Sequence, residues 1–177
     1  MLKIILKFNI LSTLYFLCFL YLKAEELDSW SHLSLKGGTY FKKSDDKPFT
    51  GILKNFHNSG SLSLKSNFKD GKQHGEFQTF HPNGKISIEG NFEMGKKIGQ
   101  WSEFYDDGSS YWKLNYTDGK IDDGLFEMFH KNGNLRSSVT YKNDMPATNW
   151  TYYDEMGEIE RIDIYKNGKF IYEKHLN

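Results

Sequence analysis

The sequence has few residues that could cross-link the chain or perform chemistry. Its 177 residues include three prolines and a single cysteine, Cys18. Because one thiol has no partner within the chain, no internal disulfide can form. The chain also lacks a Gly-x-Ser-x-Gly segment, a His-Glu-x-x-His segment and a glycine-rich phosphate loop ahead of a helix, each of which places a reacting group in a defined position. We therefore expect no enzymatic activity, no cofactor and no small-molecule substrate.

Long apolar runs are absent except near the N-terminus. There Lys3 and Lys7 precede 15 uncharged residues, 8–22, and the small residue Ala24 follows. A helix that crosses a bilayer needs about 20 apolar residues, whereas a signal peptide has a shorter run, a positive start and a small residue at its end. We expect residues 1–24 to form a signal-peptide helix that is cleaved near Ala24. The mature protein is then exported to the periplasm, the cell surface or the medium.

Two other fates of this segment fit the sequence less well than cleavage. A retained membrane anchor would need a longer apolar run than residues 8–22 provide. Lipid attachment would use Cys18, but Leu17 and Phe19 are bulky, whereas lipoprotein acceptor sites have small neighbours. We therefore expect export without a lipid.

Charge of one sign is not concentrated anywhere in the chain. Basic and acidic residues are balanced at 23 each, and removal of residues 1–24 takes away three lysines and no acid, which leaves 20 against 23, a net charge of −3. Nucleic-acid binding requires a basic surface that displaces counterions from phosphates. This pattern excludes nucleic acid as a partner. Contact with a membrane surface is a further alternative. Such contact usually requires a basic amphipathic face, which the sequence does not contain.

Glycine, by contrast, recurs at a constant interval. Successive units begin at Gly51, Gly75, Gly99, Gly124 and Thr148, in steps of 24, 24, 25 and 24 residues. A second glycine follows nine residues later, and a third closes each unit except the fourth, where Asp144 stands instead. Such a period indicates stacked copies of one small structural unit. The predicted turn glycines are Gly60, Gly71, Gly84, Gly95, Gly108, Gly119, Gly133, Gly157 and Gly168.

Aromatic residues keep the same register in every unit. Three columns run along the chain: Phe77, Trp101, Phe126 and Trp150, with Leu53 in the first unit; Phe56, Phe80, Phe104, Phe129 and Tyr153; and Phe68, Phe92, Tyr116, Tyr141 and Tyr165. Aromatic side chains on adjacent strands lie close enough to pack on one another. We interpret these columns mainly as core, although they would also suit the binding of a sugar or another protein.

The local chemistry predicts β-hairpins. Asn83-Gly84 and Asp118-Gly119 are dipeptides that accept positive φ in tight turns. After each mid-unit glycine the residues alternate with period two, as at Ile86 and Ile88. We predict an all-β fold, an elongated antiparallel meander of five 24-residue hairpin repeats. The repeats are 48–74, 75–98, 99–123, 124–147 and 148–177, and the last of these contains a terminal strand that begins a sixth unit.

The ends and junctions of this array are less regular. Within an N-terminal segment, 25–47, we expect Thr39 to Lys43 to form a strand that leads into the repeats, and Glu25 to Lys36 to be loosely attached. In the fifth unit Arg161 and Asp163 stand where apolar residues are expected, which predicts a shifted or bulged strand. The missing glycines at Asp144 and Thr148 leave the regularity of that junction open. Whether Phe77 and Phe80, three residues apart, share a face depends on a bulge that the sequence does not decide.

The segments from Phe68 to Phe77 and from Tyr116 to Phe126 resemble the MORN repeat, in which an aromatic residue, a turn glycine, His-Gly and another aromatic follow in order. The variant with Asn-Gly-Lys in mid-hairpin, at Asn83, is similar to the bacterial YwqK-like antitoxin-component group. The resemblance covers about residues 38–174. It implies stacked hairpins, and it associates the chain with scaffolding, lipid contact and protein partners.

Two sets of residues are candidates for a site. His57, His81 and His130 occupy one slot in units one, two and four. Equivalent residues on successive hairpins are about 9.6 Å apart, whereas metal ligands lie about 2.0–2.1 Å from one ion. We therefore expect a surface stripe at the turns and no metal site.

A single-layer sheet exposes one apolar face, which favours a partner surface. The candidate partner-binding residues are Trp101, Trp112 and Trp150. We expect an exported binding or scaffolding module that mediates protein or envelope-surface interaction, including self-association. The alternative is an antitoxin-like inhibitor of a toxic protein partner.

Overall fold

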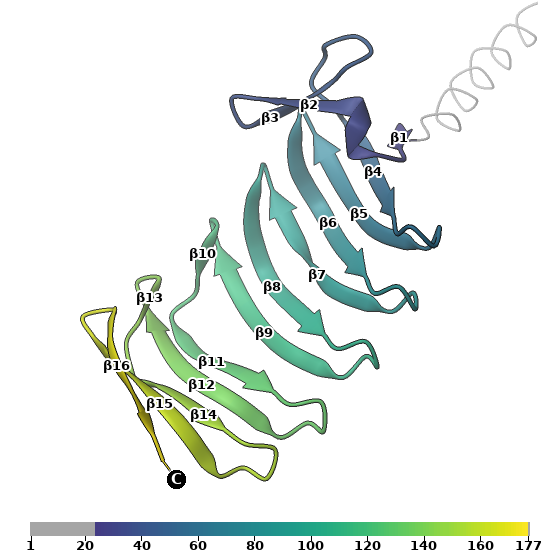
Figure 1. Cartoon of the computed structure of the whole chain (residues 1–177). Coiled ribbons are helices and arrows are strands. Elements are labelled where there is room, and N and C mark those ends of the chain that lie inside the picture. The colour runs from purple at the N-terminus through teal and green to yellow at the C-terminus, as the bar shows by residue number, and fades with distance from the viewer. Residues whose placement is uncertain (1–23, 177) are drawn as a thin grey trace, which may run out of the picture.

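The computed structural model describes residues 24–176, and the expected signal peptide lies almost entirely outside that range. The described chain is built of β-strands, which form one 14-stranded sheet and a separate two-stranded sheet. Strands that follow one another in the chain lie side by side in the long sheet (Figure 1). The predicted all-β meander is therefore confirmed.

The elements are β1 (Glu26–Leu27), the short 3-10 helix η1 (Trp30–His32), β2 (Leu33–Lys36), β3 (Thr39–Lys42), β4 (Gly51–Phe56), β5 (Leu62–Lys69), β6 (Lys72–Phe80), β7 (Ile86–Glu93), β8 (Lys96–Phe104), β9 (Ser110–Thr117), β10 (Lys120–Ile121), β11 (Gly124–Phe129), β12 (Leu135–Lys142), β13 (Met145–Pro146), β14 (Trp150–Tyr153), β15 (Ile159–Lys166) and β16 (Lys169–His175). The five repeats contribute the hairpins β4–β5, β6–β7, β8–β9, β11–β12 and β14–β15. The mid-unit turns lie along one long edge of the sheet and the connections between hairpins along the other (Figure 1). None of the helical structure in residues 24–176 is long and apolar enough to cross a membrane.

The two kinds of turn have different chemistry. Between hairpins, two residues in succession adopt positive φ, as at Asp70 (48°) and Gly71 (74°), which is the geometry that matches the twist of paired strands. Asn143 (52°) and Asp144 (63°) form the same turn without glycine, so the junction between units four and five is regular. In the mid-unit turns the glycine alone has positive φ, 85° at Gly84. All nine predicted turn glycines have φ between 73° and 93°.

Every repeat hairpin contains one β-bulge at the same position in its second strand. In the second unit Thr79 pairs with Ile88, and Phe80 pairs with Ile86, which leaves one extra residue in β7. Paired residues share a face and successive residues alternate. Phe80 and Ile86 therefore lie on the face opposite to Phe77. The prediction that Ile86 and Ile88 share a face is wrong, because the bulge resets the alternation between them. The extra residues are Ser63, Ser87, Tyr111, Arg136 and Glu160.

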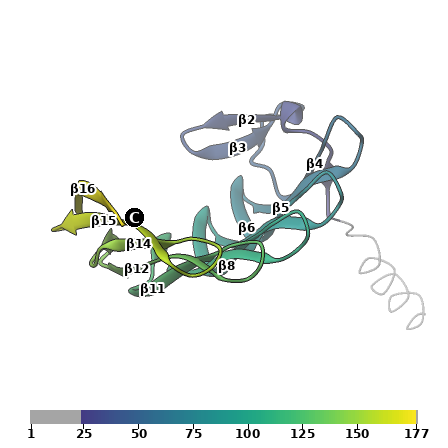
Figure 2. The ribbon, with the colours of Figure 1, turned by 60° about the horizontal axis from the view of Figure 1, so that its bottom comes forward.

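The sheet has two unlike faces. We call the side with Leu53, Phe68, Phe77, Phe92, Trp101, Tyr116, Phe126, Tyr141, Trp150 and Tyr165 the aromatic face. The opposite side, the polar face, presents a central row that includes Lys65, Gln78 and Glu89, and the column of Phe56 and Phe80 lies near its mid-unit turns. The sheet curls toward the side that carries β2 and β3 (Figure 2), which is the aromatic side.

The N-terminal segment is a cap on the first repeat. Trp30, Tyr40 and Phe49 all contact the Phe68 ring, with centroid distances of 6.1, 5.4 and 5.5 Å. Leu33 is 6% exposed and belongs to the same buried cluster. The expectation of a loosely attached segment is therefore wrong, because its apolar side chains cover the end of the aromatic face.

The segment also enters the sheet differently from the prediction. The predicted strand is present as β3, but it pairs with β2 in the separate sheet and is not a strand of the long sheet; its Tyr40 N–H donates to the Gly71 carbonyl of the first repeat at 2.8 Å. Instead, β1 extends the long sheet by pairing parallel with β4.

The fifth unit keeps the register of the others. Trp150 pairs with Asp163, as Phe126 pairs with Val139 in the fourth unit. Of the two predicted alternatives, a shifted or a bulged strand, the bulge is present and the shift is not, and the bulge is the one that all repeats share. Asp163 lies on the aromatic face because an ion pair with Arg161, Nε to Oδ1 at 3.0 Å, compensates its charge.

Gly90 offers a test of how tightly the aromatic face is packed. A methyl group at this position would lie 2.3 Å from the Trp101 indole. We expect Gly90→Ala to lower the free energy of unfolding by about 1–3 kcal/mol, the usual cost of overpacking, as measured by urea denaturation. In a Trp101→Leu background the same substitution should cost much less, and an equal cost in both backgrounds would show that the indole is not the obstacle.

Candidate partner-binding face

On the aromatic face, a row of aromatic residues forms two groups of ring contacts that link the second hairpin to the third, and the third to the fourth and fifth. Trp101 contacts Phe77 from the preceding hairpin and Tyr116 from its own, at centroid distances of 5.4 and 6.2 Å. In the second group, Phe126 contacts Trp112 of the third hairpin at 6.3 Å and Trp150 of the fifth at 5.8 Å. Edge-to-face and tilted pairs of this kind add about 0.5–1.5 kcal/mol beyond the area that they bury. The row therefore joins hairpins that would be marginal alone.

Beyond the N-terminal cap, no other element covers this row within residues 24–176. Trp101 is 2% exposed and donates its indole N–H to the Asn91 carbonyl at 3.2 Å, so it is core and leaves little surface for a partner. Trp112 and Trp150 are half-buried. Of the three predicted tryptophans, these two present ring surface to solvent. The other half-buried residues of the row are Phe77, Phe92, Tyr116, Tyr141 and Tyr165.

Lys97 brings a positive charge onto the row. Its ammonium lies 4.1 Å from the Trp101 ring centroid and 5.0 Å from that of Tyr116, an arrangement in which the ring faces attract the cation. Burial lowers the pKa of Lys97, and burial raises the pKa of the Tyr116 hydroxyl. No carboxylate of the described residues forms an ion pair with Lys97, so the rings are its main stabilising contact.

Trp112 is fixed in a different way. It contacts the Phe126 ring at 6.3 Å, and its indole N–H donates to a carboxylate oxygen of Glu103 on the paired strand. A carboxylate on an otherwise apolar face is accommodated because it accepts this hydrogen bond. These contacts fix the orientation of Trp112, which remains half-buried.

The C-terminal end of the face is charged. The Arg161 guanidinium lies 4.1 Å from the Tyr152 ring centroid and forms its ion pair with Asp163 on the same strand. Burial lowers the pKa of Arg161, but contacts with Tyr152 and Asp163 outweigh it and hold the pKa above its ordinary value. Tyr152 in turn stacks on Trp150, with centroids 6.1 Å apart and planes at 11°. The charged end is therefore continuous with the aromatic row.

The histidine column has a structural role that the sequence did not reveal. The Nε2 atoms of His57, His81 and His130 lie 2.8, 2.9 and 2.8 Å from the carbonyls of Phe80, Phe104 and Tyr153 in the next hairpin. In the third unit the Tyr105 hydroxyl fills the same slot and donates to the Phe129 carbonyl at 2.9 Å. The histidines lie at the mid-unit turns as expected, and together with Tyr105 they also connect the turns of the first four units to the following hairpin.

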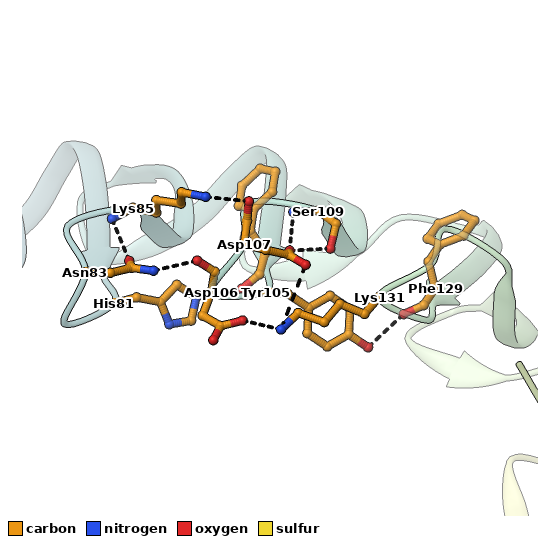
Figure 3. Close-up of polar contacts among 10 residues, drawn as sticks. His81, Asn83, Lys85, Tyr105, Asp106, Asp107, Ser109, Phe129 and Lys131 are labelled. Carbon is orange, nitrogen blue, oxygen red and sulfur yellow. Dashed lines mark hydrogen bonds and ion pairs between the residues drawn. The ribbon is translucent and has the colours of Figure 1, made fainter.

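Other side chains of the turns reinforce that connection (Figure 3). Asn83 donates to the Asp106 carbonyl at 2.6 Å and Lys85 to the Asp107 carbonyl at 2.7 Å. Lys131 reaches back to the Asp106 carboxylate at 2.5 Å, and this contact lowers the pKa of Asp106. The turn residues are thus occupied with one another. No group of histidine, aspartate, glutamate or cysteine side chains within residues 24–176 is arranged to hold a metal ion.

The comparisons with known proteins agree with the repeat architecture. The model of the MORN repeat variant matches residues 73–94 and 122–143, and each match covers one hairpin, β6–β7 and β11–β12. No curated protein is significantly similar to the chain.

Among solved structures, the chain is similar to one from the "Crystal structure of accessory secretory protein 1,2 and 3 in Streptococcus pneumoniae", with 14% identity and a TM-score of 0.29. The match covers 76% of this chain and 22% of that one, so the present chain spans about a fifth of its length. This likeness carries no argument about function. The chain is thus a repeat protein of stacked β-hairpins, two of which match the MORN repeat variant.

Removal of the Tyr105 hydroxyl tests the connection between hairpins. Tyr105→Phe removes the part-buried hydrogen bond to the Phe129 carbonyl, and a hydrogen bond of this kind contributes about 0.5–1.5 kcal/mol net. We expect a loss of that size in urea denaturation. His81→Tyr, which copies the third unit into the second, should retain most of its stability, whereas His81→Phe should not. Equal stability of the Tyr and Phe variants would contradict the role of the hydrogen bond.

The different burial of the tryptophans gives a second prediction. Trp101→Ala should lower the free energy of unfolding by about 3–5 kcal/mol, because it empties a fully buried site. Trp112→Ala should cost clearly less, since that side chain is only half-buried. Thermal or chemical denaturation measures both, and a loss below about 1 kcal/mol for Trp101→Ala would mean that the row is not the core.

Proposed function

We propose that the protein is an exported, non-catalytic module that binds a protein partner along its aromatic face. The observation that carries this proposal is the row of half-buried rings that no element of residues 24–176 covers after the first repeat. Large exposed apolar surfaces on soluble proteins usually mark interaction sites. Tryptophan, tyrosine and arginine, which gather on this face, are also the residues that contribute most to protein interfaces.

Other classes of partner suit this surface less well. The charges on the aromatic face are few and of both signs, which disfavours a polyanion such as nucleic acid. An enzyme would need convergent reacting groups, whereas the polar side chains of the turns are occupied by contacts between hairpins. The expected export rests on the N-terminal sequence alone, and it places the partner in the envelope or outside the cell. An antitoxin-like inhibitor would share the same face but would have one dominant toxic partner.

Affinity capture with matched variants tests the proposal. Trp112→Ser introduces the residue that fills the same slot in the fourth unit, Ser137, and removes one accessible ring. The control is Lys113→Ser, because Lys113 follows Trp112 in β9 and lies on the opposite, polar face. We expect a partner captured from the native envelope to be retained at least about tenfold less by Trp112→Ser than by the wild type or the control, because exposed aromatic anchors carry much of an interface's energy.

Unfolding curves of both variants would establish that each is folded at the temperature of capture. If every captured protein is retained equally by the wild type and Trp112→Ser, the aromatic face is not the binding surface. If nothing is captured under any condition, the proposed binding function itself is contradicted.

A further inference from the structure

Both arginines of the chain, Arg136 and Arg161, line one hollow of about 350 Å³ at the C-terminal end of the sheet. Tyr152, His130 and His175 form other parts of its wall. These side chains come from β12, β14, β15, β16 and the turn after β11, so the hollow exists only because the last two hairpins stack. Arg136 is the bulge residue of its hairpin, which places it beside the aromatic face.

The two guanidinium groups differ in how their charge is compensated. Arg161 is held by Asp163 at 3.0 Å and lies 3.8 Å from Glu173. Arg136 makes no ion pair with any described residue, and its contact is with the Tyr111 ring, 5.6 Å from the centroid. The Arg136 guanidinium therefore has donors free for a ligand, in the planar arrangement that binds a carboxylate or phosphate through two hydrogen bonds.

The surrounding charges select between those anions. Glu160 lines the hollow, and Asp163 and Glu173 lie against Arg161, so three carboxylates accompany two guanidinium groups. A doubly charged phosphate would be repelled more strongly by these carboxylates than a singly charged carboxylate would be. The carboxylates therefore disfavour a dianion, and the attraction for a monoanion comes from Arg136, which makes no ion pair with any described residue.

The hollow is continuous with an apolar surface. Tyr152 forms part of its wall and stacks on Trp150, which contacts Phe126 at 5.8 Å. A ligand whose anionic group reached Arg136 would have its neighbouring atoms against these rings.

From this juxtaposition we propose that the hollow binds a carboxylate of an extended peptide segment of the partner, with Arg136 as the anchoring residue and Tyr152 and Trp150 as the platform for an adjacent apolar side chain. This inference rests on the proposed function and assigns a specific chemistry to one end of the same face. The carboxylate is either the C-terminus of the peptide or the side chain of an internal acidic residue.

Nuclear magnetic resonance can test this directly, because a chain with two arginines gives only two arginine Nε–Hε signals. The purified protein is titrated with N-acetyl-Phe-Leu bearing a free carboxylate, with the same dipeptide as its amide, with N-acetyl-Leu-Glu-Leu amide and with inorganic phosphate. We expect the acid to shift the Arg136 signal and to bind about tenfold more tightly than the amide, the preference that a charge-assisted pair provides. Comparison with the glutamate peptide distinguishes a terminal from a side-chain carboxylate.

Arg136→Gln should abolish the preference for the acid, whereas Lys113→Gln on the polar face should preserve it. Equal affinity of acid and amide, or a preference that survives Arg136→Gln, would overturn the assignment. Tighter binding of phosphate than of either carboxylate would also overturn it, because the charge balance would then have been misjudged.

Capture of the partner separates the two proposals. If Trp112→Ser releases the partner but Arg136→Gln does not, the aromatic face binds and the carboxylate site is wrong. If neither substitution affects capture, the failure lies with the proposed function. Loss of capture in both variants, together with the acid preference, supports both.

Discussion

The fold depends on ring contacts between aromatic side chains of successive hairpins on one face of a single sheet. A β-hairpin in isolation buries too little surface to be stable in water, and a single sheet has no second layer to supply a core. Here the core is the row itself, in which Trp101 contacts Phe77, Phe92 and Tyr116. Because each unit packs only on its neighbours, stability accumulates along the array.

A second set of contacts connects successive hairpins along the edge of the sheet that carries the mid-unit turns. The imidazoles of His57, His81 and His130 and the hydroxyl of Tyr105 each reach a carbonyl of the following hairpin. One slot thus uses two residue types, because an imidazole nitrogen and a phenol hydroxyl can each reach a backbone carbonyl of the next hairpin. In the fifth unit the slot holds Asp154, which bonds to its own turn instead.

The same architecture explains why the face is available for binding. Several rings of the row, among them Trp112 and Trp150, are only half-buried, and the N-terminal cap covers only the beginning of the row. The bulge in each hairpin adds one residue next to that row. In the fourth unit that residue is Arg136. The bulge that recurs in every hairpin thus places a guanidinium group beside the aromatic row.

Much of the fold follows from short-range chemistry and could be predicted from the sequence. Glycine at fixed intervals dictates where the backbone adopts positive φ, and the aromatic columns in phase with it dictate which residues meet across strands. These are properties of neighbouring residues and of one repeated spacing. Gly90, however, does not belong to that spacing. Glycine is needed there because the Trp101 ring lies against the backbone. No sequence pattern predicts such a contact.

The sequence by itself determined the repeat, its period, its turns and the columns that form the core. Only the tertiary structure decided three other features. These are the bulge at Phe80, which accompanies its place on the face opposite to Phe77, the packing of the N-terminal segment on Phe68, and the placement of Arg136 and Arg161 around one hollow. The physical reason is that each of these depends on the register between strands or on contacts between segments distant in the chain. Local propensity does not encode such contacts, whereas stacking of the hairpins fixes them.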